Sequence, residues 1–419
     1  MTGLAPSNGI RIERYPLGKR FALTFVDDTD LSTRANTEPV YDFLAAHGIW
    51  GAKTVWPLAA TRPSVFRRDA EHGRVDRDSG STLEEPDYAA FIRKLKQQGF
   101  EIALHGMSAG NTRRAEVDAG LARFVDVVGE PPSLNAFHRT NLENLYCGAH
   151  KLDSRLLRLV EQMTDKSAYE GHVPGTESFW GDVVLRTFRY VRLPFHTIDA
   201  IDTLRVNPSM PFRDPRRPFV REWFASSDGA DVRRFNRLLA APQVDRLERA
   251  GGACVVYTHF AKAFAVPSGG TVRLNQDFVA VVKDLARRSS GWFANATVVL
   301  DRLAAVRAVS LTHRGRAVEV RSASDRPLDG LVLSLPAGLT LSDGGEALRE
   351  AAPGTVVLPT LAPGATLSLS ANRDGSQTIA GVPQVEISRR EHRRIEYANY
   401  AGLVRGAWAD RRDERRRRS

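Results

Sequence analysis

Cysteine is nearly absent from the chain, with two residues, Cys147 and Cys254, among 419. Two thiols cannot form the disulfide framework of a small secreted protein or a zinc knuckle, so a reducing compartment is expected. Both lie in mixed apolar segments, where a small buried residue is expected rather than a nucleophile. The chain also lacks any run of about 18 apolar residues, and positions 1–14 contain no apolar core of signal-peptide length. These absences predict a cytoplasmic protein with no transmembrane segment.

Basic charge is unevenly distributed along the chain. The formal net charge is +10, and residues 411–419 hold six arginines beside one aspartate and one glutamate. A second basic cluster occupies 389–394. Aromatic residues are not interleaved with these charges as they are in nucleic-acid readers, so no specific nucleic-acid partner is expected. The sequence predicts a solvated basic tail over 376–419, with contact between its arginine run and anionic lipid heads or an acidic polymer as the alternative.

Composition and patterning indicate an α/β protein. The apolar content of 42% and the charged content of 26% are those of a globular chain, and 419 residues suggest two domains. Short apolar runs alternate with amphipathic segments that begin at capping residues and end at glycine. Strands are expected at 21–26, 52–58, 100–104, 134–137 and 254–258, and helices at 36–48, 86–98 and 112–128. Such alternation predicts a parallel sheet whose ligands gather at the carboxyl ends of the strands.

Beyond position 308 the pattern changes to short alternating segments separated by Gly, Pro and Asp turns. These segments predict a small β-sandwich with strands at 317–321, 331–335, 355–358 and 365–370. We therefore expect three parts along the chain. They are an α/β domain over 1–308, an accessory β-sandwich over 309–375 and the basic tail over 376–419.

Acidic and imidazole side chains stand at the ends of four expected strands. The run 21–26 stops at Asp27 and Asp28, with Asp30 close behind, and three carboxylates so near one another would repel unless a cation lay among them. Other strands end in histidine, namely at His105, His138 and His259. An aspartate with two imidazoles suits zinc or a similar divalent ion and leaves an open position for water. A second aspartate could then accept a proton from that water, and His259 could donate one to a leaving group.

The segment Thr24-Phe25-Val26-Asp27-Asp28 resembles the first motif of the polysaccharide deacetylase superfamily, the NodB-type carbohydrate esterases. The resemblance implies a distorted (β/α) barrel of about seven parallel strands. It also implies a general base at the first aspartate of the pair, Asp27, and a metal ligand at the second, Asp28. The implied cofactor is a divalent ion, with zinc expected first, and the implied substrate is a saccharide or polysaccharide.

Later motifs of the same family occur in the expected order, and the resemblance covers residues 10–308. His105-Gly-Met-Ser-Ala109 resembles the second motif, in which the second histidine of the family is here replaced by Ala109. His138 is available as a third protein ligand. The implied metal shell is then Asp28, His105 and His138. Val256-Tyr-Thr-His259-Phe resembles the last motif and implies that His259 protonates the leaving group.

Four residues are candidates for substrate binding. The segment His138-Arg-Thr-Asn-Leu-Glu-Asn144 resembles the arginine-containing third motif, which makes Arg139 and Asn141 candidates. Arg213 lies in a loop with four prolines between 207 and 219. It could meet an acidic sugar or a phosphate there, or stay a solvated arginine. Trp223 could stack on a sugar ring or lie in the core.

The sequence therefore predicts a metal-dependent hydrolase that cleaves a C–N or ester bond to remove acetyl groups from a saccharide or polysaccharide precursor, in bacterial surface-polysaccharide metabolism. Two alternatives stay open. The replacement of the second histidine by Ala109 is compatible with a catalytically inactive member that binds or scaffolds polysaccharide. A metal-independent glycoside hydrolase would need Asp27 and another carboxyl group about 5 to 10 Å apart across a groove.

Overall fold

The computed structural model describes residues 9–64, 79–139, 141–164, 168–268 and 271–418 of the chain. The chain forms two compact units. The first is built from Met1–Ala22, Ser289–Trp292 and Val298–Val385, and the second from Leu23–Arg288, Phe293–Thr297 and Glu386–Ser419. Each unit therefore combines segments that are distant in sequence. Strand β12 (Gly291–Phe293) and helix α11 (Ala296–Arg307) contain points at which the chain passes from one unit to the other.

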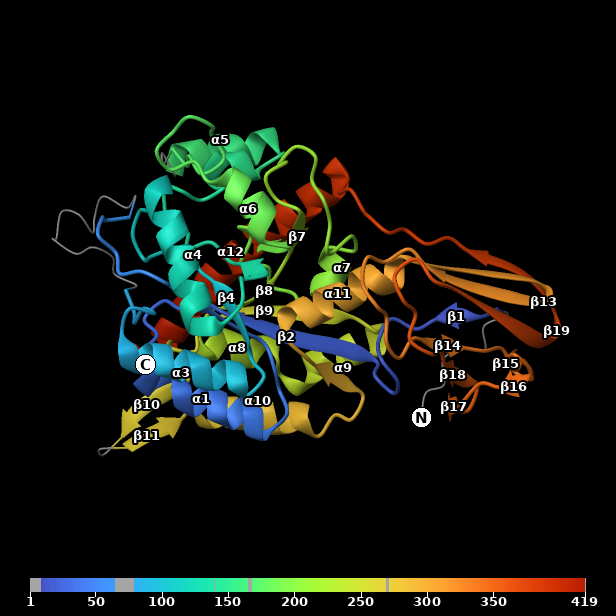
Figure 1. Cartoon of the computed structure of the whole chain (residues 1–419). Helices are drawn as coiled ribbons and strands as arrows, with labels where there is room; N and C mark the ends of the chain where they lie inside the picture. The colour runs from blue at the N-terminus through green and yellow to red at the C-terminus, as the bar shows by residue number, and fades with distance from the viewer. Residues whose placement is uncertain (1–8, 65–78, 140, 165–167, 269–270, 419) are drawn as a thin grey trace. The chain divides into compact units, whose positions relative to one another are not determined.

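A curled parallel sheet forms the centre of the second unit (Figure 1). Its order is β7 (Glu222–Phe224), β6 (Tyr190–Arg192), β5 (Leu134–Asn135), β4 (Glu101–Leu104), β3 (Ala52–Val55), β2 (Phe21–Asp27), β9 (Ala253–Thr258) and β8 (Ser227–Gly229). Every residue of β2 is buried. The distorted (β/α) barrel predicted from the sequence is confirmed, and the carboxyl ends of its strands meet at one edge, as parallel strands require.

Helices flank this sheet, and their ends follow local sequence signals (Figure 1). Thr33 caps the first helix through a reciprocal pair of hydrogen bonds with Asn36. Gly129 and Gly251 end two others with φ angles of 87° and 60°, which glycine adopts without strain. The helices are α1 (Arg34–Ala46), α3 (Pro86–Gln97), α4 (Arg114–Val128), the 3-10 turn η1 (Gly148–Lys151), α5 (Arg155–Thr164), α6 (Gly181–Thr187), α7 (Thr203–Val206), α8 (Val232–Leu238), α9 (Ala241–Ala250) and α10 (Gln276–Ala286), with the hairpin β10 (Ala265–Ser268) and β11 (Thr271–Leu274) before α10.

The first unit contains two antiparallel sheets around a separate apolar core. One has the order β1 (Arg11–Ile12), β14 (Val332–Ser334), β18 (Thr355–Val357) and β17 (Glu350–Ala352). The other has the order β13 (Val309–Ser322), β19 (Thr366–Ile379), β15 (Leu341–Asp343) and β16 (Glu346–Ala347). The antiparallel strands predicted after position 308 are therefore present. Strand β1 pairs with β14, which brings an N-terminal segment into this unit and was not predicted from the sequence.

The C-terminal segment forms one long helix, α12 (Arg389–Arg418), which belongs to the second unit with the parallel sheet. His392, Ile395 and Glu396 of this helix are completely buried. The structure therefore has a packed helix where the sequence predicted a basic tail, because the contacts that hold it come from residues distant in sequence. The side chains of residues 410–419, which include the arginine run, lie outside the described residues.

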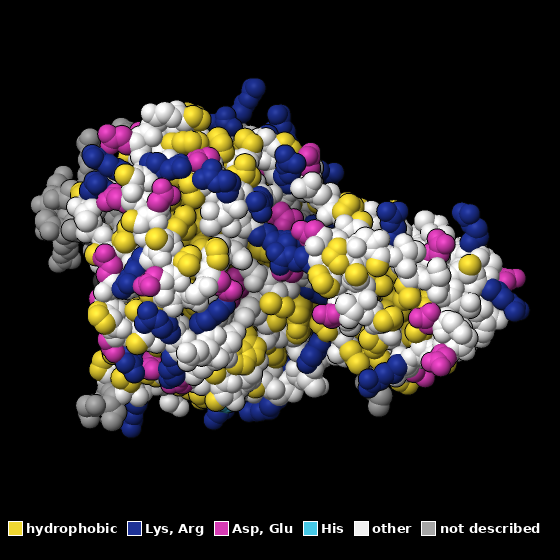
Figure 2. All heavy atoms as spheres, viewed as in Figure 1, with side chains coloured by type: hydrophobic (Ala, Val, Ile, Leu, Met, Phe, Trp, Pro, Cys, Tyr) yellow, Lys and Arg dark blue, Asp and Glu magenta, His cyan; other side chains and the backbone are white. Residues whose placement is uncertain are grey.

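Basic and acidic side chains are both scattered over the face seen in Figure 2. In the part of the chain that the structure describes, helices that combine the length and the apolar character needed to span a bilayer are not found.

Candidate metal centre

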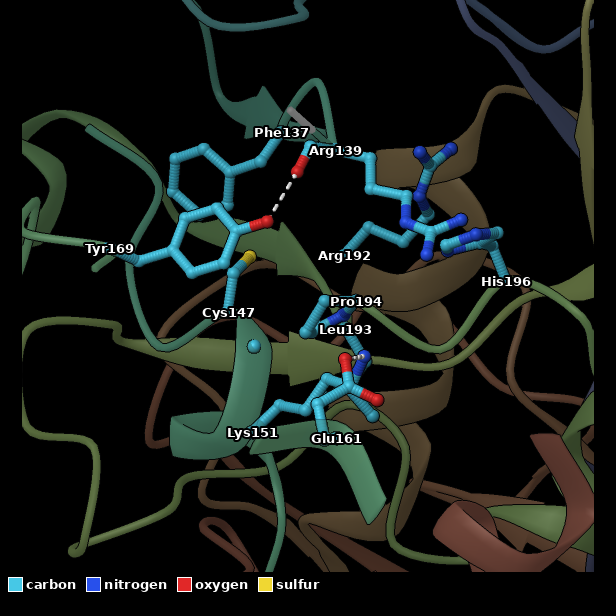
Figure 3. A pocket seen from close by; sticks show the side chains of 11 residues that line it. Phe137, Arg139, Cys147, Lys151, Glu161, Tyr169, Arg192, Leu193, Pro194 and His196 are labelled. Carbon is cyan, nitrogen blue, oxygen red and sulfur yellow. Dashed lines mark hydrogen bonds and ion pairs between the residues drawn. The ribbon is translucent and has the colours of Figure 1, made fainter. Parts of the chain in front are cut away.

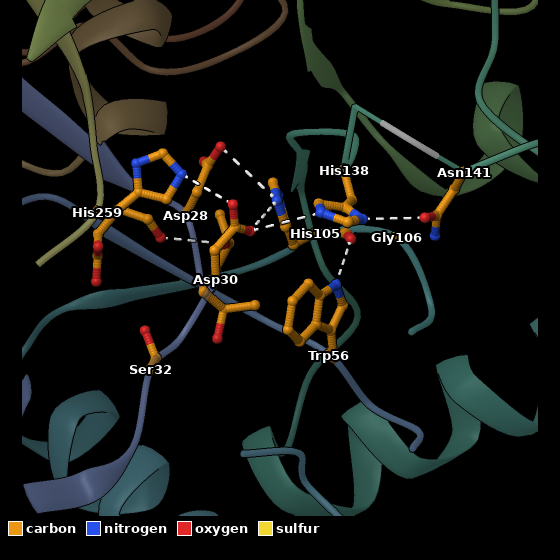
Figure 4. A network of polar contacts seen from close by, with 12 residues as sticks. Asp28, Asp30, Ser32, Trp56, His105, Gly106, His138, Asn141 and His259 are labelled. Atoms are coloured by element: carbon orange, nitrogen blue, oxygen red, sulfur yellow. Dashed lines mark hydrogen bonds and ion pairs between the residues drawn. The ribbon is translucent and has the colours of Figure 1, made fainter. Parts of the chain in front are cut away.

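Three buried side chains meet at the carboxyl ends of neighbouring strands (Figure 4). Asp30 follows β2, His105 follows β4, and His138 follows β5. The Oδ1 atom of Asp30 lies 3.1 Å from Nε2 of His105 and 3.9 Å from Nε2 of His138. One ligand atom from each of the three residues lies within 4.8 Å of the other two. Donor atoms at this spacing can surround a single ion.

The tautomer of His138 is set by a chain of hydrogen bonds. Asn141 donates through Nδ2 to the carbonyl oxygens of Ser108 and Gly110, at 2.9 and 2.8 Å. Because carbonyl oxygens can only accept, Asn141 must present Oδ1 to the Nδ1 atom of His138, which lies 3.0 Å away and so carries the proton. The lone pair of His138 is then at Nε2, on the side of Asp30. Support of this kind at the second ring nitrogen is usual for histidines that bind metal ions.

His105 turns its Nε2 atom toward the same point. Its main-chain carbonyl accepts a hydrogen bond of 2.9 Å from Nε1 of Trp56. The Trp56 ring packs against the rings of His105 and His138, with centroid separations of 5.8 and 5.3 Å. The Nδ1 atom of His105 is buried and has no hydrogen-bond partner among the described residues. Trp56 therefore forms an apolar wall on one side of the two imidazoles, and Nε2 is the nitrogen that meets polar groups.

A sharp change of backbone direction brings Asp30 into the cluster. Strand β2 ends at Asp27, and Leu31 directly after Asp30 has a φ angle of 59°, in the left-handed region. For a residue with a side chain this conformation costs on the order of 1 to 2 kcal/mol, so the surrounding contacts must hold it. Burial opposes ionisation of Asp30, but His259, His105 and His138 together hold its pKa well below the usual value. Asp30 is therefore a carboxylate at neutral pH.

Asp28 stands beside the cluster and is held by an arginine. Arg192, at the end of β6, donates to its two oxygens at 2.7 and 2.6 Å. The guanidinium also lies over the ring of Tyr257, 4.8 Å from the centroid. Burial opposes ionisation of Asp28, but Arg192 and then His105 lower its pKa. Oδ2 of Asp28 lies 3.7 Å from Nε2 of His105, so an ionised carboxylate of fixed orientation faces the candidate metal position.

Asp27, which the sequence predicted as the general base, is directed away from the cluster. Its Oδ2 atom accepts hydrogen bonds from Nζ of Lys53 at 2.9 Å and from the hydroxyl of Tyr41 at 2.8 Å. Its Oδ1 atom accepts from the main-chain N–H of Phe260 at 2.7 Å. The side chains of Asp27 and Lys53 are completely buried. Asp27 therefore lies inside the core, where its hydrogen bonds join β2 to its neighbours, and the carboxylate beside the cluster is Asp28.

His259, at the end of β9, lies on the other side of Asp30 (Figure 4). Its Nδ1 atom is 2.8 Å from the carbonyl oxygen of Ala230, and its Nε2 atom is 3.0 Å from Oδ2 of Asp30. The carbonyl oxygen can only accept a hydrogen bond, so Nδ1 donates to it and Nε2 is the nitrogen that faces Asp30. Lys262 places Nζ 3.6 Å from the same carboxylate oxygen. Nε2 of His259 therefore lies at the edge of the cluster, in contact with Asp30.

The residues present fit a divalent cation. One carboxylate oxygen and two imidazole nitrogens form a ligand set that zinc and similar ions accept. Permanent cations already stand beside each carboxylate of the region, with Lys53 at Asp27, Arg192 at Asp28 and Lys262 at Asp30. A divalent ion would therefore make the site positive overall. An anionic ligand of the ion would offset that charge.

The structure brings together most, but not all, of the predicted site residues. Asp28, His105, His138 and His259 lie in or beside the cluster, and Asn141 orients His138. Asp27 faces Lys53. Arg139 is exposed and lines a neighbouring cavity.

Two predicted substrate-binding residues lie elsewhere in the second unit. Arg213 is exposed, and its main chain pairs with residues near the start of α12, where its carbonyl oxygen accepts from the N–H of Ile387 at 3.0 Å. Trp223 in β7 is completely buried and packs against Tyr146, with ring centroids 6.3 Å apart. A stacking platform for a sugar must be accessible, so Trp223 has the core role that the sequence left open.

Sequence reasoning did not identify Asp30, Arg192 or Lys262 as members of the site. A signal for Asp30 was present, because Asp28 and Asp30 are two positions apart and residues at that spacing share one side of an extended chain. Arg192 ends an apolar segment, as the three histidines do. Which cation meets which carboxylate depends on the order of the strands in the sheet, and single-sequence patterns do not contain that order.

This chain resembles known proteins in its structure and not in its sequence. No protein-family model and no curated protein sequence matches this chain. A presumed polysaccharide deacetylase from Mycobacterium smegmatis is 11% identical with a TM-score of 0.39, over 72% of this chain and 95% of that protein. Puue allantoinase is 11% identical with a TM-score of 0.40, over 70% and 93%. A probable polysaccharide deacetylase from Pseudomonas aeruginosa PAO1 is 11% identical with a TM-score of 0.36, over 68% and 91%.

These likenesses concern the arrangement of sheet and helices. The chain is similar in that arrangement to polysaccharide deacetylases, the family that its first motif resembles. The functional conclusion has to come from the residues at the carboxyl edge of the sheet.

Proposed function

We propose that the protein is a metal-dependent hydrolase that removes acetyl groups from a saccharide or polysaccharide precursor, in bacterial surface-polysaccharide metabolism. The observation that carries the proposal is the hydrogen-bond chain from two main-chain carbonyls through Asn141 to Nδ1 of His138. A histidine with a purely structural role does not need the lone pair of Nε2 directed at a buried carboxylate and a second imidazole. The motif beginning at Thr24 and the (β/α) barrel support the substrate class.

Asp30, His105 and His138 would hold the ion, for which zinc is the first candidate. A divalent ion in such a site supplies a polarised acyl carbonyl and a water molecule that ionises near neutral pH. Asp28 accepts the proton of the attacking water, since Arg192 keeps it ionised and fixed in orientation. His259 donates the proton at its Nε2 atom to the departing amine or alkoxide. Asp28 thus takes the role that the sequence assigned to Asp27, and Asp30 the role assigned to Asp28.

The metal content and activity of four matched proteins test this proposal. The protein as purified, Asp30→Asn and Asp28→Asn are compared with Asp42→Asn, which changes an exposed carboxylate on α1. Metal is measured by mass spectrometry, and deacetylation is measured on acetylated oligosaccharides with and without added zinc. We expect about one equivalent of metal in all but Asp30→Asn. In Asp28→Asn the metal should be retained while the rate falls by roughly 10²- to 10⁴-fold.

Two results would contradict the proposal. If the purified protein contains no divalent metal and takes up none from a micromolar solution, the hydrolytic mechanism fails. If Asp28→Asn retains the full rate, another group is the base.

A polysaccharide-binding protein without catalysis is the second candidate function. It is favoured by the charge balance of the site, in which Lys53, Arg192 and Lys262 already match three carboxylates. Saccharide binding measured by calorimetry in the absence of metal, with no deacetylation in its presence, would support it. The glycoside hydrolase alternative requires Asp27 at the edge of a groove. Both oxygens of Asp27 accept hydrogen bonds inside the core, so the structure does not favour this alternative.

Two further proposals concern the location of the protein and the contacts of its C-terminal arginines. We propose a cytoplasmic location, which fractionation of the native host would test. We also propose that the arginine run 411–418 contacts an anionic surface. Cosedimentation with anionic lipid vesicles should then decrease when the chain is shortened to end at 410, and equal binding by both chains would contradict the proposal.

A further inference from the structure

A small cavity adjoins the candidate metal centre (Figure 3). Its volume is about 30 Å³, room for roughly two water molecules or one small charged group. It lies between the segments that follow β5 and β6, with η1 and α5 completing the wall. Arg192 links the two places, because it binds Asp28 beside the metal centre and also lines the cavity. The cavity and the surroundings of the metal centre therefore share one side chain.

Basic side chains dominate the lining of the cavity. The four basic groups are Arg139, Lys151, Arg192 and His196, and the acidic one is Glu161. Lys151 is paired with Glu161 at 2.7 Å, and Arg192 is paired with Asp28 at 2.6 Å. Arg139 is exposed and forms no ion pair within the described part of the chain. The cavity thus retains one permanent positive charge that the protein does not balance.

His196 lies beside these basic groups and lines the same cavity. Burial and then the charges of Arg139, Arg192 and Lys151 hold the pKa of its imidazole well below the usual value. The ring packs against Tyr257, with centroids 5.3 Å apart. His196 is therefore neutral at physiological pH and adds a hydrogen-bonding group without adding charge. The cavity favours an anion over a cation or a neutral group.

Figure 3 also shows how the lining is divided. The rings of Phe137 and Tyr169 lie on one side, and Arg139, Arg192 and His196 gather on the other. The Tyr169 hydroxyl donates to the carbonyl oxygen of Arg139 at 3.2 Å, which fixes the main chain from which the arginine extends. An apolar wall opposite a guanidinium suits a carboxylate or phosphate attached to a sugar ring.

We propose that this cavity binds an anionic substituent, a carboxylate or a phosphate, of the same saccharide whose acetyl group lies at the metal centre, and that Arg139 is the residue that recognises it. The inference rests on the proposed function and names its substrate class as acidic acetylated sugars. Arg192 is held in place by Asp28, so Arg139 is the guanidinium that remains free to meet the anion.

Matched acetylated sugars test the inference. N-acetylglucosamine is the neutral probe, N-acetylmuramic acid carries a carboxylate, and N-acetylglucosamine 6-phosphate carries a phosphate. The kcat/KM for deacetylation is measured with the unchanged protein, with Arg139→Gln and with Arg93→Gln, which alters an exposed arginine on α3. We expect at least one anionic sugar to be preferred over the neutral one by roughly 10- to 100-fold. Arg139→Gln should abolish that preference and change the neutral sugar by no more than about 3-fold, and Arg93→Gln should leave it intact. The two anionic probes show which anion fits.

Dissociation constants measured by calorimetry separate this inference from the proposed function. If none of the sugars is hydrolysed but the anionic ones bind in an Arg139-dependent manner, the hydrolase proposal fails and the anion site stands. Equal binding and equal turnover of neutral and anionic sugars would overturn the inference. So would an Arg139→Gln variant that loses the same factor on all three probes, because Arg139 would then serve no charge recognition.

Discussion

The buried pair of Lys53 and Asp27 allows a sharp test of how the two acids at the end of β2 divide their roles. Both side chains are completely buried, and Nζ of Lys53 lies 2.9 Å from Oδ2 of Asp27 and 2.8 Å from Oγ of Ser32. Burial alone would lower the pKa of Lys53, but Asp27 raises it, so the ammonium stays charged. Lys53→Met keeps a similar volume and removes the charge. Asp27 is then left as an unpaired carboxylate in the core.

The size of the effect follows from the geometry. At the 2.9 Å separation of Nζ and Oδ2, two unit charges attract by about 6 kcal/mol at an effective dielectric constant of about 20. Removing one partner of a buried pair costs about 3 to 5 kcal/mol in practice. Tyr41 and Phe260 still donate to Asp27, which places the expected loss near about 3 kcal/mol. A typical domain is stable by about 5 to 15 kcal/mol, so the variant folds with a much smaller margin.

Urea unfolding followed by tryptophan fluorescence measures this loss. Trp56, Trp180 and Trp223 are completely buried in the unit that contains the pair, so their emission reports its unfolding. The double variant Asp27→Asn/Lys53→Met removes both charges and should recover most of the stability, because neutral replacements of buried pairs are often tolerated. A loss below about 1 kcal/mol for Lys53→Met would refute the reasoning.

The double variant also decides the role of Asp27. If it folds and retains metal and activity, Asp27 is structural, as its contacts indicate. If it folds and retains metal but loses all activity, the general base is Asp27 after all, and the prediction from the sequence motif stands.

Two further predictions concern buried carboxyl groups that are not candidate metal ligands, one of which, Glu143, accepts a hydrogen bond of 2.9 Å from Asn141. Burial raises the pKa of Glu143 from 4.5 to about 7. Between these values only the folded chain keeps the proton, so stability should fall as pH rises through this range, by about 3 kcal/mol in total. In the unchanged protein the urea midpoint should be lower at about pH 8 than at about pH 5, and in Glu143→Gln this difference should disappear. The same difference in both proteins would contradict the prediction. Glu396 of α12 accepts hydrogen bonds from the N–H groups of Asp153 and Ser154 before α5. Glu396→Gln should cost about 1 to 3 kcal/mol and speed hydrogen exchange in α12, whereas unchanged exchange would show that this contact does not hold the helix.

The fold and the three histidines could be predicted from the sequence because the relevant rule is local. Apolar runs of strand length alternate with amphipathic helices, and parallel strands present their carboxyl ends at one edge. His105, His138 and His259 each follow such a run. Their position at one edge of the sheet therefore follows from the pattern, whereas their distances depend on the strand order.

The division of labour among the acids could not be predicted in the same way. Asp27, Asp28 and Asp30 are adjacent in sequence, and their directions depend on where β2 ends and on the left-handed backbone at Leu31. Lys53 was an unused signal, since a lysine inside the buried strand β3 needs a buried acid as its partner. Strand order decides that this acid is Asp27.

The packing of α12 has a practical consequence for anyone who wishes to produce the unit with the parallel sheet alone. A gene fragment that stops near position 308 or 375 would include every strand of the parallel sheet and would still be incomplete. It would leave the N–H groups of Asp153 and Ser154 without their acceptor and would uncover the surface on which Ile395 is buried. The shortest useful expression fragment has to skip the intervening β-sheets and rejoin the chain at about residue 386, where the second unit resumes. Such a fusion, rather than a simple truncation, is the appropriate starting point for crystallisation or directed evolution.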